Sequence, residues 1–137
     1  MTQHNRGRCQ CGNVQYRASG QAKVSALCHC SMCRRAHAAP AVAWALFDSS
    51  QVTFTKGEPK RFESSPDAQR GFCADCGTQL CFKASYLPGM IDISIGSLDD
   101  PNAISPSLHY WHEQHLTWFN VSDDLQRYDQ WPPLGEE

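Results

Sequence analysis

Long apolar runs, an excess of basic residues and internal repeats are all missing from this sequence. Without a run of about 20 apolar residues, we expect no membrane-spanning helix and no membrane partner. The 12 lysines and arginines stand against 14 aspartates and glutamates, which gives a net charge of −2. Because nucleic-acid binding usually needs a basic surface, this balance argues against a nucleic-acid partner. The first residues, MTQHNRGRC, also lack the apolar core of a secretion signal, so we expect a cytoplasmic protein.

Cysteine, in contrast, is abundant, with 8 in 137 residues. An even number of cysteines is compatible with disulfides in a secreted protein. A chain of this length can bury a core without such cross-links, however, and no export signal is evident. The cysteines also fall in close groups with C-x-C and C-x-x-C spacing, which places two thiolates on one small ion. We therefore predict metal binding rather than disulfides.

The pattern of apolar residues predicts one mainly β domain that covers residues 1–137. Alternating or continuous apolar residues indicate the expected strands, which are 13–18, 40–47, 51–55, 60–64, 78–83 and 90–96. In the strand at 78–83, the alternation places Leu80 and Phe82 on one face and Cys81 on the other.

Few segments favour a helix. We expect a short helix over 31–38 and one helical turn within 122–128. The segment 97–110 contains two prolines and is predicted to be a loop. No regular structure is expected after Trp131.

Two cysteine pairs are each followed by a glycine. They are C-x-C at 9–11 and C-x-x-C at 73–76, followed by Gly12 and Gly77. A glycine after a ligand pair lets the backbone turn tightly and direct amide N–H groups at the sulfurs. Each pair also precedes an expected strand, so each fits the tip of a hairpin. Because four thiolates close a tetrahedral site, we predict a structural zinc on Cys9, Cys11, Cys73 and Cys76.

The segment LCHCSMCRRAH at 27–37 contains a second group, Cys28, Cys30 and Cys33. Its C-x-C-x-x-C spacing lets one short turn place three sulfurs around an ion. Three protein ligands and one open position are typical of catalytic zinc, so we expect water or a substrate in the fourth place. His29 and Cys81 are the protein alternatives. His29 would have to fold back against the turn, and Cys81 fits a small buried residue of a strand.

Three thiolates on one ion would leave an excess of negative charge and favour a soft sulfur donor as fourth ligand. A thiol that binds there loses its proton and becomes a nucleophile. Arg34 and Arg35 directly follow the three cysteines. They can offset the negative charge or hold the carboxylates of an anionic thiol, although such a pair can also be solvated surface charge.

Several motifs occur in the order found in a known family. They are GRCQCGNVQY at 7–16, CHCSMCRRAH at 28–37, RGFCADCGTQL at 70–80, SSP at 64–66, GSLDDP at 96–101 and the pair His109 and Trp111. In these motifs, from about Gly7 to about Tyr128, the chain resembles the glutathione-dependent formaldehyde-activating enzyme family, also called the CENP-V/GFA domain family. The chain departs from that pattern at Gln126, where the family commonly has D-L-P, and at the extra thiol of Cys81.

The resemblance implies a β-tent fold of short antiparallel strands, stapled by two zinc ions per chain. One ion would be structural, on the four paired cysteines, and the other catalytic, on Cys28, Cys30 and Cys33. It also implies an enzyme, a carbon–sulfur lyase of the S-hydroxymethylglutathione synthase type with glutathione as co-substrate. The expected partners are therefore a small thiol and an aldehyde.

For this activity we expect catalytic roles for His29 and Arg34 beside the three cysteines, and glutathione binding by Arg34 and Arg35. Water, His29 or His37 would protonate the new alkoxide. The alternative is a non-catalytic, zinc-stabilised binding or sensor domain of the same fold. Its four tryptophans could then line a groove for a partner. The sequence predicts no oligomeric state.

Overall fold

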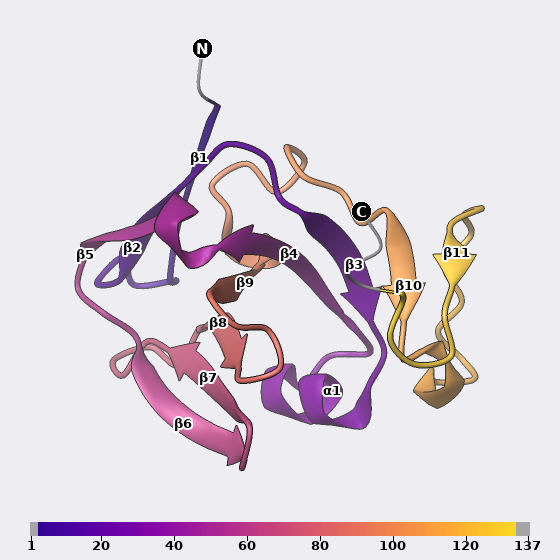
Figure 1. The fold of residues 1–137 in the computed structure, drawn as a ribbon. Helices are drawn as coiled ribbons and strands as arrows, with labels where there is room; N and C mark the ends of the chain where they lie inside the picture. The colour runs from indigo at the N-terminus through magenta and orange to yellow at the C-terminus, as the bar shows by residue number, and fades with distance from the viewer. Residues whose placement is uncertain (1–2, 134–137) are drawn as a thin grey trace.

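The computed structural model describes residues 3–133, which form two β-sheets, one α-helix and three short 3-10 helices (Figure 1). The strands are β1 (His4–Arg8), β2 (Gln15–Ser19), β3 (Val24–Cys28), β4 (Val42–Asp48), β5 (Val52–Lys56), β6 (Lys60–Ser65), β7 (Ala68–Phe72), β8 (Gln79–Ala84), β9 (Met90–Ser94), β10 (Leu108–Tyr110) and β11 (Gln126–Arg127). The helices are α1 (Ser31–His37), η1 (Ser49–Gln51), η2 (Ile95–Ser97) and η3 (His112–Gln114). The predicted mainly β architecture is confirmed.

The smaller sheet has three antiparallel strands in the order β1-β2-β5. Tyr16 and Ala18 of β2 alternate with half-buried residues and are themselves buried in the core. The Tyr16 hydroxyl lies 2.7 Å from the Ser97 hydroxyl, which links this sheet to η2. A Cβ atom on Gly7 would collide with the Tyr16 ring, so β1 needs glycine where it crosses that side chain.

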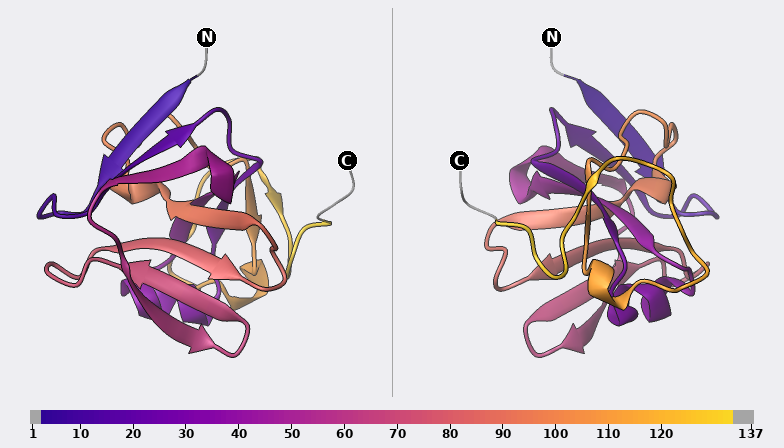
Figure 2. Two further views of the ribbon diagram at one scale, coloured as in Figure 1. Left: turned by 60° about the vertical axis from the view of Figure 1, so that its left-hand side comes forward. Right: turned by 90° about the vertical axis from the view of Figure 1, so that its right-hand side faces the viewer.

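The larger sheet has eight strands in the order β11-β10-β3-β4-β9-β8-β7-β6. Figure 2 gives two further views of the molecule. The centre of the sheet is β4, which matches the apolar run at 40–47 and is buried along most of its length. The pairings from β3 to β6 are antiparallel, as expected. The pairings of β10 with β3 and with β11 are parallel, which the prediction of antiparallel strands missed. Parallel neighbours need a long connection, and here most of the sheet lies between β3 and β10 in the chain.

The larger sheet separates two hydrophobic cores. Ala45 and Phe47 of β4 point into the first core, with Ile91 and Ile93 of β9. Trp44 of β4 points to the opposite face and packs into the second core, which also holds Phe82, Tyr110, Cys28 and Cys33. Because successive side chains of a strand alternate between faces, β4 contributes to both cores.

The prediction that Leu80 and Phe82 share a face of β8 is wrong. Leu80 is buried in the first core together with Cys81, whereas Phe82 packs into the second core. The pairing of β7 with β8 shifts register between Gly71 and Phe72, which face Cys81 and Gln79. This irregularity leaves one extra residue in β8, and an extra residue breaks the alternation of side chains.

The helix predicted over 31–38 is confirmed as α1, which ends where Ala38 adopts a left-handed conformation with φ of 50°. The helical turn predicted within 122–128 is wrong, because this segment contains the short strand β11. The loop predicted at 97–110 is interrupted at its end by β10. The prediction for the end of the chain concerns mostly residues 134–137, which lie outside the described residues. In the part of the chain that the structure describes, no helix has the length and apolarity needed to cross a membrane.

Candidate metal centres and their cavity

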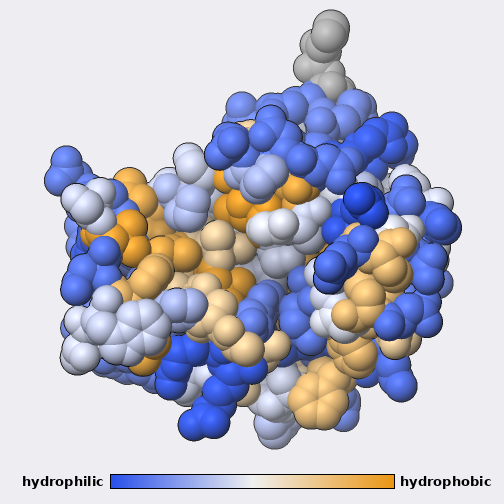
Figure 3. Space-filling model, turned by 180° about the vertical axis from the view of Figure 1, so that it is seen from behind, coloured by the Kyte–Doolittle hydropathy of each residue, from blue (hydrophilic) through white to orange (hydrophobic). Residues whose placement is uncertain are grey.

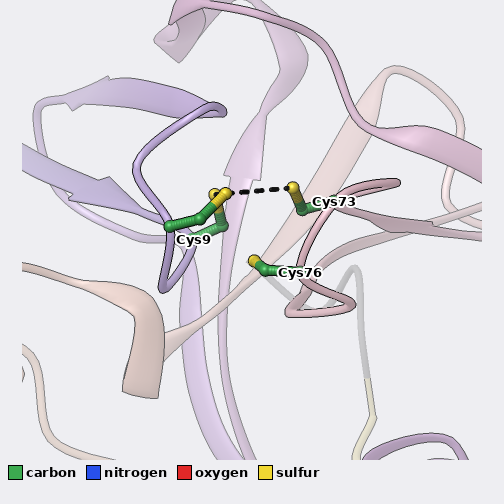
Figure 4. Close-up of side chains that lie close together, drawn as sticks. Cys9, Cys73 and Cys76 are labelled. Atoms are coloured by element: carbon green, nitrogen blue, oxygen red, sulfur yellow. Dashed lines mark hydrogen bonds between the residues drawn. The ribbon is translucent and has the colours of Figure 1, made fainter.

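The four paired cysteines come together at the tips of two hairpins. Cys9 and Cys11 lie between β1 and β2, and Cys73 and Cys76 lie between β7 and β8. The sulfur of Cys11 is 3.6 Å from that of Cys9 and 3.8 Å from that of Cys73. All four sulfurs lie within 4.8 Å of one another. Figure 4 shows those of Cys9, Cys73 and Cys76 pointing toward a common centre. The cluster therefore links the beginning of the chain to its middle.

The glycines after the two pairs adopt the backbone conformation that tight turns need. Gly12 has φ of 81° and Gly77 has φ of 83°, in the left-handed region that glycine tolerates best. The turns bring donors to the sulfurs. The Val14 N–H donates to Cys9 Sγ at 3.3 Å. Hydrogen bonds from the hydroxyl and backbone of Thr78 lower the pKa of the Cys76 thiol to about 5. Such donors stabilise thiolates, which are the form that binds a metal.

The second cluster is formed by Cys28, Cys30 and Cys33, at the end of β3 and in α1. Cys28 Sγ donates to Cys33 Sγ at 3.5 Å. Cys30 is also the N-cap of α1, because its sulfur accepts the Cys33 N–H at 3.3 Å. Hydrogen bonds from Cys28 and Cys33 lower the pKa of the Cys30 thiol well below its usual range. The spacing of the segment thus makes one short turn serve as both helix start and ligand set.

No fourth cysteine, histidine or carboxylate of residues 3–133 joins this second cluster. Cys81, the remaining thiol, is buried in the first core, and burial raises its pKa. A Cβ atom on Gly71 would collide with its sulfur, so the sulfur fills the space beside that glycine. The alternative in which Cys81 completes the site is therefore not supported, and the interpretation of Cys81 as a small buried residue fits its position.

Arg70 of β7 is the charged side chain that contacts the three-cysteine cluster. Its Nη2 donates to Cys33 Sγ at 3.6 Å, and its guanidinium lies 4.9 Å from the centre of the Phe82 ring. The residue is only 5% exposed. A buried guanidinium beside sulfur ligands offsets the negative charge of thiolates, which is the role that the sequence had suggested for Arg34 and Arg35.

A cavity of about 270 Å³ opens onto the three cysteines. Its wall includes several aromatic side chains, which are Trp44, Phe82, Tyr86, Tyr110, Trp111 and Trp131. Two charged residues also line it, Arg70 and Asp92, and both are buried. On the face of the molecule seen in Figure 3, hydrophobic residues likewise gather in a hollow of the surface between polar margins. A largely apolar wall excludes water and strengthens the electrostatic interactions within the cavity.

Asp92 of β9 enters this cavity from the sheet. It is 6% exposed, and burial raises the pKa of its carboxyl to about 7, with Cys33 adding to the rise and Arg70 opposing it. Within the described residues, neither a hydrogen-bond donor nor an ion-pair partner reaches this carboxyl. A buried carboxyl without a partner is rare outside functional sites.

No role was predicted from the sequence for Arg70 or Asp92. Arg70 begins the motif RGFCADCGTQL, three residues before a cysteine ligand. Asp92 alternates with the isoleucines of MIDISIG, in a strand, where aspartate is uncommon. That aspartate was a usable signal, because the alternation places its carboxyl on the sheet face opposite Ile91 and Ile93.

The structure places His29 outside the lining of the cavity. Its Nε2 lies 2.8 Å from Nδ1 of His109, and His109 Nε2 lies 3.0 Å from a carboxylate oxygen of Asp123. Burial lowers the pKa of His29 to about 4. His37 also lies off the cavity and packs against Trp44. A direct acid role for either histidine stays a prediction that this geometry does not favour.

Arg34 and Arg35 lie on α1 and do not line the cavity either. Arg35 is exposed and lines a neighbouring depression together with Met32 and Arg70, which line the cavity as well. Arg35 is therefore placed beside the site rather than in it. Binding of a substrate by Arg34 or Arg35 stays a prediction.

Both cysteine clusters could hold a metal ion, and their donors fit zinc. Thiolate sulfur is a soft ligand that selects zinc over magnesium or calcium, and four such ligands are typical of structural zinc. The N–H donors to Cys9 and Cys30 are directed at the sulfurs that would carry the negative charge. The residues thus fit one closed and one open zinc site.

A small mainly β protein with one four-cysteine and one three-cysteine cluster is the class that this fold and these sites define. The sequence profile described as glutathione-dependent formaldehyde-activating enzyme matches residues 4–114, and the chain belongs to that family.

Two individual proteins are similar to this chain. An uncharacterized lyase of Schizosaccharomyces pombe is 32% identical over 76 residues, which are 56% of this chain and 55% of that protein. The match thus spans about half of the relative's length. A crystal structure of a Rhodobacter sphaeroides protein has a similar fold, with a TM-score of 0.56 and 20% identity over 74% of this chain and 91% of that chain.

Proposed function

We propose that the chain is a zinc-dependent enzyme of the carbon–sulfur lyase type, which joins or cleaves a thiol and a small aldehyde. Glutathione is the thiol that the family description names. The observation that carries the proposal is the set of three cysteines that opens onto a cavity lined by aromatic side chains, with no fourth protein ligand among residues 3–133. Three protein ligands and an open place are the arrangement of catalytic zinc.

Cys28, Cys30 and Cys33 would hold the catalytic ion, and the four hairpin cysteines the structural one. When bound, the catalytic zinc supplies a Lewis-acidic position that favours the deprotonated form of an added thiol. Arg70 offsets the negative charge of the sulfurs from 3.6 Å. Arg35, in the neighbouring depression, would hold a carboxylate of an anionic thiol.

In the synthetic direction, a sulfur lone pair attacks the carbonyl carbon of the aldehyde. The carbonyl π electrons move to oxygen, and the oxygen takes up a proton, which gives a hemithioacetal. The aromatic walls hold the two reactants together and exclude competing water. The free cysteine thiols also favour the reducing cytoplasm as the compartment, because thiol ligands persist there.

The test is a screen of several thiols and aldehydes, with adduct formation followed by NMR. We expect the wild type to accelerate formation and cleavage of at least one adduct, and C30S to lose that acceleration. C81A is the matched control, because Cys81 lies in neither cluster and should behave as the wild type does. No acceleration for any pair, or equal acceleration by C30S, would contradict the proposal.

A second candidate is a non-catalytic binding or sensor domain. It is favoured by exposed aromatic side chains, Phe62 at 61% and Trp118 at 70% exposure, which are compatible with a partner surface. This candidate predicts that an added thiol leaves the absorption spectrum of a cobalt-substituted sample unchanged. The enzyme proposal predicts a shift of the thiolate-to-metal band.

A further inference from the structure

The Asp92 carboxyl occupies a position that packing alone does not explain. In register it lies opposite Leu46 of β4 and Phe82 of β8, in the centre of the larger sheet. It is buried, it lines the cavity of the three cysteines, and no described residue bonds to it. Burying an unpaired carboxyl costs several kcal/mol, so an apolar side chain would stabilise this position better. The residue is therefore a candidate for chemistry rather than for stability.

The other titratable and charged groups that face the cavity are Arg70, Tyr86, Tyr110 and the three cysteines. A guanidinium does not release its proton in proteins. Burial raises the pKa of both tyrosines, which makes them weak proton donors near neutral pH. The cysteines are the candidate metal ligands, and Arg70 already donates to Cys33. Asp92 is thus the group on this wall that can both accept and release a proton near neutral pH.

We propose that Asp92 is a catalytic residue that carries the proton from the thiol to the carbonyl oxygen. This inference rests on the proposed function, because it takes the thiol and the aldehyde as given. The carboxylate of Asp92 accepts the S–H proton as the thiol enters the cavity, which leaves a thiolate and a neutral carboxylic acid.

The same proton then completes the addition. The thiolate forms the carbon–sulfur bond, the carbonyl π bond breaks toward oxygen, and that oxygen takes the proton from the Asp92 acid. The products are a hemithioacetal and the Asp92 carboxylate, so the carboxylate is regenerated without any other reactant. In the cleavage direction the carboxylate removes the hydroxyl proton first and returns it to the departing sulfur. A proton transfer of this kind contributes about 10²–10⁴-fold in rate.

The test compares the wild type with D92N, which keeps the size of the side chain but cannot carry the proton. D124N is the matched control, because Asp124 is exposed and lies outside the cavity lining. Exchange between aldehyde and adduct is measured by NMR at pH 7, where both the carboxylate and the acid of Asp92 are populated. We expect the catalysed rate to fall by about 10²-fold or more in D92N, with the thiol-dependent shift of the cobalt band retained. D124N should behave as the wild type.

A second readout does not depend on activity or on the folding of the variant. In wild-type protein labelled with ¹³C at the aspartate carboxyls, we expect one carboxyl to titrate near pH 7, which is where burial places Asp92. If every aspartate titrates below about pH 5, or if D92N is as fast as the wild type, Asp92 is not the proton carrier.

Different results would contradict the proposed function and the role of Asp92. If the wild type neither binds a thiol at the cobalt site nor accelerates any adduct, the proposed function itself is wrong. If the wild type binds and accelerates, but D92N does so equally, only the role of Asp92 is wrong.

Discussion

Arg70 and Asp92 carry opposite charges in one cavity, yet no ion pair between them is present in the described part of the chain. Arg70 donates instead to Cys33, and its ring contact is with Phe82. Because the cation is directed at the sulfurs, the carboxyl remains without a partner and its pKa stays high. Arg70 therefore interacts with the cysteine sulfurs, and Asp92 is left free to exchange a proton with the substrate.

This environment predicts how Asp92 affects stability. Its pKa is about 7 in the folded protein, whereas an unperturbed aspartate titrates near pH 4. As pH rises from about 4 to about 7, the unfolded chain loses this proton first, so the carboxyl makes folding progressively less favourable. Below this window both states are protonated, and above it both are ionised.

We therefore expect the free energy of unfolding of D92N to increase relative to wild type by about 2–3 kcal/mol between pH 5 and pH 8. The measurement is urea unfolding of both proteins at several pH values, with D124N as control. Both proteins are compared at the same zinc content per chain. Parallel stability curves of D92N and wild type would show that Asp92 has an ordinary pKa.

The two hairpin turns are the elements in which sequence and structure agree best. Their C-x-C and C-x-x-C spacings, each followed by a glycine, predicted four sulfurs around one centre. The reason is that the motif is local, and the φ of 81° and 83° at Gly12 and Gly77 is a conformation that glycine tolerates and other residues rarely adopt. The helix α1 was also predicted from a short local segment, and Cys30 caps its start.

Replacing Gly77 by alanine tests this requirement. A Cβ atom there would meet nothing within 4 Å, so any cost comes from the left-handed backbone and should be about 1 kcal/mol. Gly96 is the matched control, since it also has free space around it and its φ is not positive. G96A should be neutral or slightly stabilising in thermal unfolding. Equal effects of the two substitutions would contradict the role of the turn.

The two cysteine clusters should respond differently to the loss of a ligand. C76S removes a ligand that ties the β7–β8 hairpin to the β1–β2 hairpin, so we expect a large loss of thermal stability or an unfolded protein. C30S should keep its fold, because a serine hydroxyl can still cap α1, and should lose thiol binding. Circular dichroism and zinc content per chain measure both. Equal unfolding of the two variants would mean that the clusters do not divide structural and catalytic roles.

At the scale of the whole molecule, the sheet order brings together residues that no local pattern connects. Arg70 of β7 and Asp92 of β9 reach one cavity because β8 lies between their strands. The mainly β class followed from the alternating strands, but β1 has a polar sequence, HNRGR, and β10 has only three residues. Such strands have no apolar periodicity to detect. The parallel pairing of β10 with β3 is a long-range contact that sequence periodicity does not encode.

The three cysteines of the second cluster are neighbours in the sequence, whereas the charged residues of its cavity, Arg70 and Asp92, come from distant strands. Arg34 and Arg35 were chosen because they follow the cysteines in the chain, yet α1 directs them away from the cavity lining. The charge that contacts the sulfurs comes from Arg70, on another strand. Proximity in sequence therefore predicted which cysteines cluster but not the groups that surround them.

The central claim is that the second metal site has three protein sulfurs and an open place. X-ray absorption at the zinc edge tests it most directly, because it counts sulfur atoms around the metal. With four cysteines on one ion and three on the other, we predict an average of about 3.5 sulfurs per zinc, rising to about 4 when a thiol is added. C81A should give the same values. An average of about 4 before any thiol is added, falling in C81A, would show a site already closed by Cys81 and would contradict the account.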